Sequence, residues 1–223
     1  MSDLKIKNLC KSFGENRIYE NFNIEFESDK VNCIIGESGG GKSTLLNIIS
    51  GLSNLDSGEI IGANKEEISY IFQEDRLIPW LTIKQNMELF IYDYFNKEEG
   101  NIKLKEVFTL LNISGIENKY PEKLSGGMKQ RVNIARALLK PSKVILMDEP
   151  FKSLDYKTKY SIMDELKTIF TKENRLVIFV THDVDEAIFM GDIIYVLGGK
   201  PFNIKGIFRE NLLDNKQKII KLI

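Results

Sequence analysis

One stretch of the chain, "VNCIIGESGGGKSTLLNIISGL" over 31–52, constrains the fold more than any other. It reads as an apolar strand, a glycine-rich turn and then a helix. The turn fits the pattern G-x-x-x-x-G-K-[ST], with Gly36, Gly41, Lys42 and Ser43 at the fixed positions. Glycines let backbone amides converge on phosphate oxygens, the lysine neutralises charge, and the hydroxyl can ligate Mg²⁺. The stretch therefore predicts a phosphate-binding loop, helped by the positive end of the helix that begins at Thr44.

A phosphate site needs a carboxylate for the metal, and "KVILMDEP" supplies one at the end of a second apolar strand. Asp148 and Glu149 are neighbours, so on a regular strand their side chains would point to opposite faces. Pro150 ends the strand and favours an extended turn at Glu149, which would bring its carboxylate toward the site. We expect Asp148 to hold Mg²⁺ and Glu149 to orient and polarise the attacking water. The alternative is a pair of solvated carboxylates at a strand end.

His182 is the only histidine in the sequence, and it follows the apolar stretch "RLVIFV". Open α/β sheets bind ligands at the carboxyl ends of their strands, so this position favours contact with a γ-phosphate. The alternative is an ordinary hydrogen-bonded histidine. The next residues, Asp183 and Glu186, have the spacing of a capping box that opens a helix.

A second helix start suited to anions is predicted by "LSGGMKQR", which spans 124–131. Ser125 is a favourable N-cap, and the two glycines that follow leave backbone amides uncovered. The phosphate loop already has its own lysine, so the sequence presents two anion-binding corners in one chain. A merely capped helix is the structural alternative.

The order of predicted elements indicates an α/β fold with a mainly parallel sheet. Short strands dominate the first seventy residues. A capping box of Thr82 and Gln85 then introduces helical periodicity. Strands and helices alternate again after "KVILMDEP". We expect one domain over 1–223, with an antiparallel β part, a core formed by 1–73 and 141–223, and a helical insert at 74–140.

Composition excludes several classes of protein. With 31 basic and 32 acidic residues the formal charge is -1, whereas proteins that coat nucleic acid are usually strongly basic. The two cysteines are too few for a disulfide framework. The N-terminus has no apolar run long enough for a signal peptide. No segment approaches the roughly 18 uncharged apolar residues that a membrane span needs. We therefore expect a protein of the cytosol with no nucleic-acid partner and no membrane span of its own.

Six motifs together resemble those of the ATP-binding cassette (ABC) ATPases, in the order that the family shows. They are "GESGGGKST", "IFQED", "LSGGMKQR", "VILMDEP", "SLD" and "VTHD". The resemblance implies a P-loop ATPase that binds ATP and Mg²⁺. The residues implied to bind the phosphates are Gly36, Ser38, Gly39, Gly40, Gly41, Lys42, Ser43 and Thr44. It implies that Lys42, Gln73, Glu149 and His182 are catalytic, and that Ser43, Gln73 and Asp148 hold the metal. It also implies that Phe13 stacks on adenine, for which core packing is the alternative.

The resemblance implies two kinds of partner. A second copy would join head to tail, with Ser125, Gly127 and Asp155 at the joint. The corner of "LSGGMKQR" at Ser125 and Gly127, here called the signature corner, would close over the partner's ATP. A transmembrane permease would insert a short helix near Gln73, which places the chain at the cytoplasmic face of the membrane. "PWLT" resembles importers of nitrate, sulfonate, taurine or thiamine precursors, which also use an extracytoplasmic solute-binding protein.

Several alternatives to an importer remain open from the sequence. They are an ABC exporter or lipid-release ATPase, a soluble cassette that acts on ribosomes or DNA, and a non-catalytic regulator. Soluble cassettes usually carry two cassettes or long coiled coils, and regulators would lose Glu149 or His182. For Pro79 and Trp80, the alternative to a mark of the importer subgroup is a core anchor at a helix entry. Glu37 stands where the family often has proline, and the segment between Gly51 and Gln73 is short for the subgroup.

Overall fold

The computed structural model describes residues 3–37, 39–152 and 154–223. Within them the strands form a three-stranded and a six-stranded sheet, in the orders β2-β1-β4 and β5-β6-β7-β3-β8-β9. The strands are β1 (Leu4–Phe13), β2 (Asn16–Phe26), β3 (Val31–Gly36), β4 (Ser57–Ile61), β5 (Ile68–Ile71), β6 (Val144–Asp148), β7 (Leu176–Val180), β8 (Ile193–Gly198) and β9 (Asn203–Phe208). The helices are α1 (Lys42–Ile49), α2 (Ile83–Ile91), α3 (Lys97–Leu110), α4 (Gly126–Leu139), α5 (Tyr156–Lys172), α6 (Val184–Met190) and α7 (Lys216–Leu222), with short 3₁₀ turns at Lys65–Glu67 and Pro121–Lys123.

The large sheet is parallel from β5 to β8, which confirms the predicted α/β fold. Its central strands are buried along their whole length. Side chains alternate between two cores, so Cys33 and Met147 join the core on the helical side while Ile34 and Leu146 join the core beneath the small sheet. Because the strands run parallel, the carboxyl ends of β5, β6, β7 and β3 meet at one edge.

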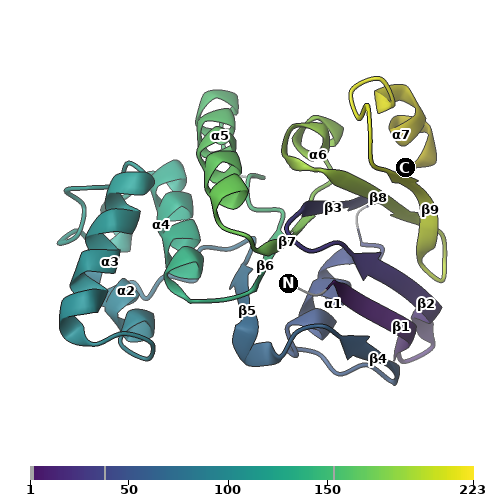
Figure 1. Cartoon of the computed structure of the whole chain (residues 1–223), viewed down its shortest axis with the longest axis horizontal. Helices are drawn as coiled ribbons and strands as arrows, with labels where there is room; N and C mark the ends of the chain where they lie inside the picture. The colour runs from purple at the N-terminus through teal and green to yellow at the C-terminus, as the bar shows by residue number, and fades with distance from the viewer. Residues whose placement is uncertain (1–2, 38, 153) are drawn as a thin grey trace.

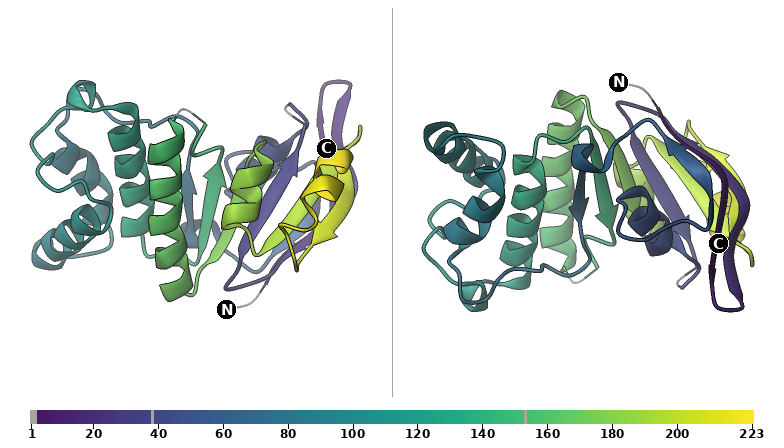
Figure 2. Two further views of the ribbon diagram at one scale, coloured as in Figure 1. Left: turned by 90° about the horizontal axis from the view of Figure 1, so that it is seen from above. Right: turned by 90° about the horizontal axis from the view of Figure 1, so that it is seen from below.

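The molecule is elongated, with the helical insert at one end and the antiparallel strands at the other (Figures 1 and 2). The insert comprises α2, α3 and α4, which follow β5 and precede β6. The predicted box at Thr82 and Gln85 is present and begins α2. A second box at Asn96 and Glu99 begins α3.

Two C-terminal elements were not predicted from the sequence. The antiparallel edge strand β9 pairs with β8, and its side chains alternate between exposed and half-buried. Gly206 within it has no side chain, which weakens the strand pattern in the sequence. The short helix α7 buries Ile219 as its one fully covered residue within the described part of the chain.

The core-anchor interpretation of Trp80 is wrong, because this residue is 75% exposed. Buried anchors of the entry to α2 are instead Leu77 and Ile83. Asn86 supports the same turn, since its side chain donates to the backbone carbonyls of Ile78 and Leu81. Among the described residues, we find no helix that has both the length and the apolar character needed to cross a bilayer.

Candidate nucleotide site

The glycine-rich loop is packed from behind by side chains of other elements. Gly41 is the N-cap of α1 and has φ +111°, in the left-handed region that favours glycine. A Cβ on Gly40 would overlap the ring of Phe202, at 1.5 Å. The hydroxyl of Tyr19 donates to the Gly41 carbonyl at 3.1 Å. Phe202 and Tyr19 therefore back the loop on one side, and the left-handed Gly41 gives the chain reversal that a phosphate cradle requires.

Lys42 lies inside this loop and is only 4% exposed. Its Nζ donates to the carbonyls of Gly36, at 2.8 Å, and Glu37, at 2.7 Å. Burial lowers the pKa of Lys42, although the nearby carboxylates of Glu149 and Asp148 oppose the shift. The ammonium group is therefore held within the loop by two backbone carbonyls.

Ser43 and Asp148 come together although they are far apart in the sequence. The Ser43 hydroxyl donates to Oδ1 of Asp148 at 3.1 Å, and Tyr70 donates to Oδ2 at 3.4 Å. Burial raises the pKa of Asp148, and the charge of Glu149 adds to this. A hydroxyl and a carboxylate are oxygen donors of the kind that Mg²⁺ accepts, so these residues fit the predicted metal site.

Glu149 has φ +43°, which corrects the expected extended conformation. Its amide donates to the carbonyl of Val180 at the end of β7. This hydrogen bond, and not the preference set by Pro150, fixes the backbone conformation of Glu149. One carboxylate oxygen lies 3.3 Å from Nδ1 of His182, and the other 2.9 Å from Nζ of Lys152. Burial alone would raise the pKa of Glu149, but the ion pair with Lys152 and the contact with His182 lower it.

The predicted capping box after His182 is only half formed. Asp183 caps α6 by accepting from the amides of Asp185 and Glu186. The carboxylate of Glu186 does not return to the Asp183 amide, which instead donates to Thr181 Oγ1. Glu186 is buried and pairs with Lys159, because a second element supplies a cation at this place.

Gln73 follows β5 at the same edge and is exposed. It lines a hollow of about 600 Å³ together with Gly126 of α4 and with Pro150 and Leu154, which follow β6. The carboxyl ends of β5, β6 and β7 thus bring Gln73, Asp148, Glu149 and His182 to the edge that carries the phosphate loop.

The second anion-binding corner has the predicted local structure. Ser125 is the N-cap of α4, and its hydroxyl accepts from the Met128 amide at 3.3 Å. Ser125 and Gly126 are exposed, and a Cβ on Gly126 would meet no atom within 4 Å. Asp155, exposed as well, caps α5 through the Thr158 amide at 3.0 Å. None of these residues contacts Lys42 or Asp148 in the described hydrogen bonds and ion pairs.

Phe13 ends β1 and is 54% exposed, which rules out the core-packing alternative. Lys11 lies over its ring, with Nζ 4.9 Å from the centroid. The predicted residue Ser38, and Ser153 of the "SLD" motif, lie outside the described residues.

Two residues of the site were missed by the sequence reasoning. Tyr70 contacts Asp148, and its position one residue before the end of β5 could have indicated this, since β5 and β6 are neighbours. Lys152 contacts Glu149, and a cation three residues after a glutamate in a turn was the available signal.

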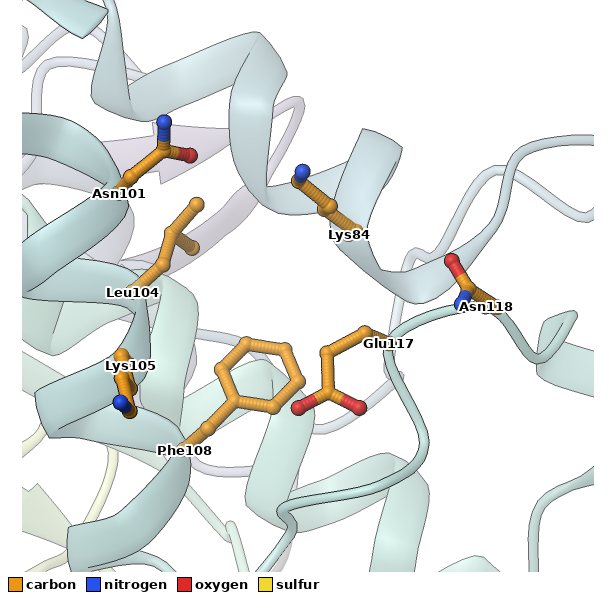
Figure 3. Close-up of a pocket in the computed structure, with 7 residues that line it drawn as sticks. All are labelled: Lys84, Asn101, Leu104, Lys105, Phe108, Glu117 and Asn118. Atoms are coloured by element: carbon orange, nitrogen blue, oxygen red, sulfur yellow. The ribbon is translucent and has the colours of Figure 1, made fainter. Parts of the chain in front are cut away.

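A separate hollow of about 350 Å³ lies in the insert, away from these residues. Leu104 and Phe108 project into it from α3, with Glu117 on the facing segment and Lys84 on α2 (Figure 3). Its side chains include no partner of the phosphate loop, so it is not part of the nucleotide site.

Comparison with known proteins gives consistent results. The ABC transporter family model matches residues 19–152. The aliphatic sulfonates import ATP-binding protein SsuB of Bacillus thuringiensis subsp. konkukian (strain 97-27) is 41% identical over 221 residues, covering 95% of this chain and 86% of that protein. A dimeric structure of MJ0796, a bacterial ABC transporter cassette, has a TM-score of 0.82 at 33% identity and covers 92% of this chain and 98% of that one. MJ0796 also has a dimeric post-hydrolysis structure bound to ADP and Pi, with a TM-score of 0.82, 33% identity and the same coverage of 92% and 98%.

The family match spans the phosphate loop, the insert and the two carboxylates at the end of β6. The relative's similarity extends this over nearly the whole chain. The chain therefore belongs to the ABC transporter family and is one of its ATP-hydrolysing cassettes.

Proposed function

We propose that this chain is the ATPase subunit of a membrane importer for an organic sulfonate or a related small anion. It works as a head-to-tail dimer, bound to a permease at the cytoplasmic face of the membrane. The cargo class rests on the similarity to SsuB. The observation that carries the dimer is the presence of two anion-binding corners, of which only the loop at Gly41 has its own lysine and carboxylates.

ATP binds with adenine stacked on Phe13 and its phosphates in the loop from Gly36 to Thr44. The exposed face of Phe13 supports the stacking. Lys42 exchanges its bonds to the Gly36 and Glu37 carbonyls for phosphate oxygens, which keeps its charge paired.

Ser43, Asp148 and Gln73 would hold Mg²⁺, which supplies positive charge beside the phosphate oxygens when bound. Glu149 orients the attacking water and accepts its proton at a carboxylate oxygen. His182 donates from Nδ1 to Glu149 and turns Nε2 toward the γ-phosphate. The 3.3 Å contact between the two side chains supports this arrangement.

The signature corner of one copy closes over the ATP of the other. Ser125 and the amide of Gly127 add hydrogen-bond donors to the γ-phosphate, and the start of α4 adds a favourable dipole. Asp155 lies at the joint between the copies. ATP binding thus favours the closed pair, and hydrolysis releases it.

The permease docks where the core meets the insert. A hollow of about 380 Å³ opens there, and its lining includes Phe72, Arg76, Phe90, Tyr94, Arg136 and Lys140. Aromatic walls suit an apolar anchor, and the three cations suit acidic groups on the incoming helix. Arg136 donates to the carbonyls of Asp75 and Arg76, so the hollow is tied to the segment after Gln73.

The test is reconstitution of the cassette with its permease and solute-binding protein in liposomes. An alkanesulfonate at saturating concentration should stimulate ATP hydrolysis, while sulfate should not. Copurification with ribosomes and no integral-membrane companion would reject the proposal. Hydrolysis that no sulfonate stimulates would reject the cargo class alone.

A further inference from the structure

Glu186 is a buried acid that the predicted capping box does not explain. The residue is 4% exposed, and its carboxylate points away from the amide it was expected to cap. A buried carboxylate is stable only when it is paired and hydrogen-bonded. Its two oxygens have separate partners, Thr181 on one and Lys159 on the other.

Lys159 reaches this acid from a different element. It lies in the first turns of α5, and its Nζ is 2.8 Å from Oε1 of Glu186 and 3.1 Å from Oδ2 of Asp183. Its side chain is only 15% exposed. Burial lowers the pKa of Lys159, but the bonds to the two carboxylates outweigh it and the net shift is upward. The lysine therefore stays charged within the network.

The network holds the backbone on both sides of His182. The Thr181 hydroxyl donates to Oε2 of Glu186 at 2.6 Å. The Asp183 amide donates to the same hydroxyl at 3.1 Å. His182 itself is about half exposed and has Glu149 as its described ion-pair partner, so its position depends on these flanking residues.

The same lysine is tied to the predicted joint. The Lys159 amide donates to the carbonyl of Asp155 at 2.9 Å, within the first turn of α5. We propose that Lys159 is a positioning residue. It holds the segment 181–183, which carries His182, in a fixed position relative to Asp155 at the start of α5. The proposal rests on the proposed function. A shift of the second copy at Asp155 would then be passed to His182 through one side chain.

The test compares Lys159→Met with the conservative Lys159→Arg. Methionine leaves Glu186 without its cation, so kcat for ATP should fall about 10- to 100-fold through misplacement of His182. The KM for ATP should change less than threefold, because the phosphate loop is untouched. Arginine keeps the charge and should restore most of the kcat.

Lys167→Met is the matched control. Lys167 also joins α5 to α6, through a 2.9 Å bond from Nζ to the Phe189 carbonyl, but it lies two turns farther from the switch. We expect it to leave kcat within a factor of two. An equal loss of kcat in both variants would mean that the helix pair, and not the switch, depends on these lysines.

A double-mutant cycle with His182→Ala decides whether Lys159 acts through His182. If it does, Lys159→Met should add less than a twofold loss in the His182→Ala background. Normal kcat in Lys159→Met, or the full loss repeated in His182→Ala, would overturn the proposal. Failure of the proposed function is separate, since the wild-type cassette would then copurify with ribosomes and without an integral-membrane companion, whatever the kcat ratios of these variants.

Discussion

The loop at Gly41 and the corner at Gly126 are both helix starts that we propose bind phosphate, but their surroundings are opposite. The first is backed by Phe202 and Tyr19 and contains a buried lysine. The second has no atom within 4 Å of a Cβ placed on Gly126. One corner is therefore finished within the chain, whereas the other is open to solvent at Gly126. The difference supports the proposal that the second corner completes a site whose remaining parts belong to another copy.

The largest expected effect comes from the finished corner. Glu149→Gln removes the carboxylate that accepts the proton of water, so kcat should fall about 10³-fold. ATP affinity, measured by equilibrium binding, should be unchanged, since Lys42 and the loop are intact. Asp164→Asn on the exposed surface of α5 serves as the charge control. Undiminished hydrolysis in Glu149→Gln would remove this residue from its role.

The open corner gives the next largest effect. Ser125→Arg fills it with a long side chain, and we expect at least a 10²-fold loss of ATPase activity. Binding of ATP to the monomer should survive, because the loop at Gly41 is elsewhere in the chain. Thr109→Arg, on the exposed side of α3, is the matched control, and we expect it to keep normal ATPase activity. An equal loss of monomer binding would contradict the proposed division of labour between the two corners.

A change at Phe13 tests whether the nucleotide site at the Gly41 loop also includes a contact with the adenine of ATP. Phe13→Ala removes a stacking surface, which corresponds to roughly a tenfold weaker ATP affinity. Phe13→Tyr should keep the affinity, and kcat at saturating ATP should stay within twofold for both. Unchanged ATP affinity in Phe13→Ala would show that adenine binds elsewhere.

The smallest expected effect is that of Gly126→Ala at the open corner, where the change in stability and the change in ATPase activity should have opposite signs. Gly126→Ala should stabilise the isolated chain by about 0.5 kcal/mol, because alanine suits a helix better than glycine. Activity should nevertheless fall, since the methyl group would occupy space needed by the partner's nucleotide. Gly127→Ala is the comparison, as its Cβ would lie 2.7 Å from Cγ2 of Thr158 and should lower the free energy of unfolding. Urea denaturation and ATPase assays on both variants would check this, and full activity in Gly126→Ala would argue against a partner there.

Much of this contrast could be predicted from the sequence. The phosphate loop, the N-cap at Ser125 and the buried β6 and β7 have strong local patterns. The backbone of Glu149 and the partner of Glu186 could not be predicted, because each depends on a distant element. The capping-box pattern at Asp183 shows this best. The pattern correctly predicted that Asp183 caps the start of α6. The side chain of Glu186, however, points to Lys159 of α5 and not to the amide of Asp183.

The most direct measurement is the mass in solution of the Glu149→Gln variant with and without Mg²⁺ and ATP, determined by analytical ultracentrifugation at high protein concentration. We expect a monomer without nucleotide and a doubled mass with it, and no doubling when Ser125→Arg is added. A nucleotide-bound protein that stays monomeric, alone and with its permease, would contradict the claim that two copies share each ATP.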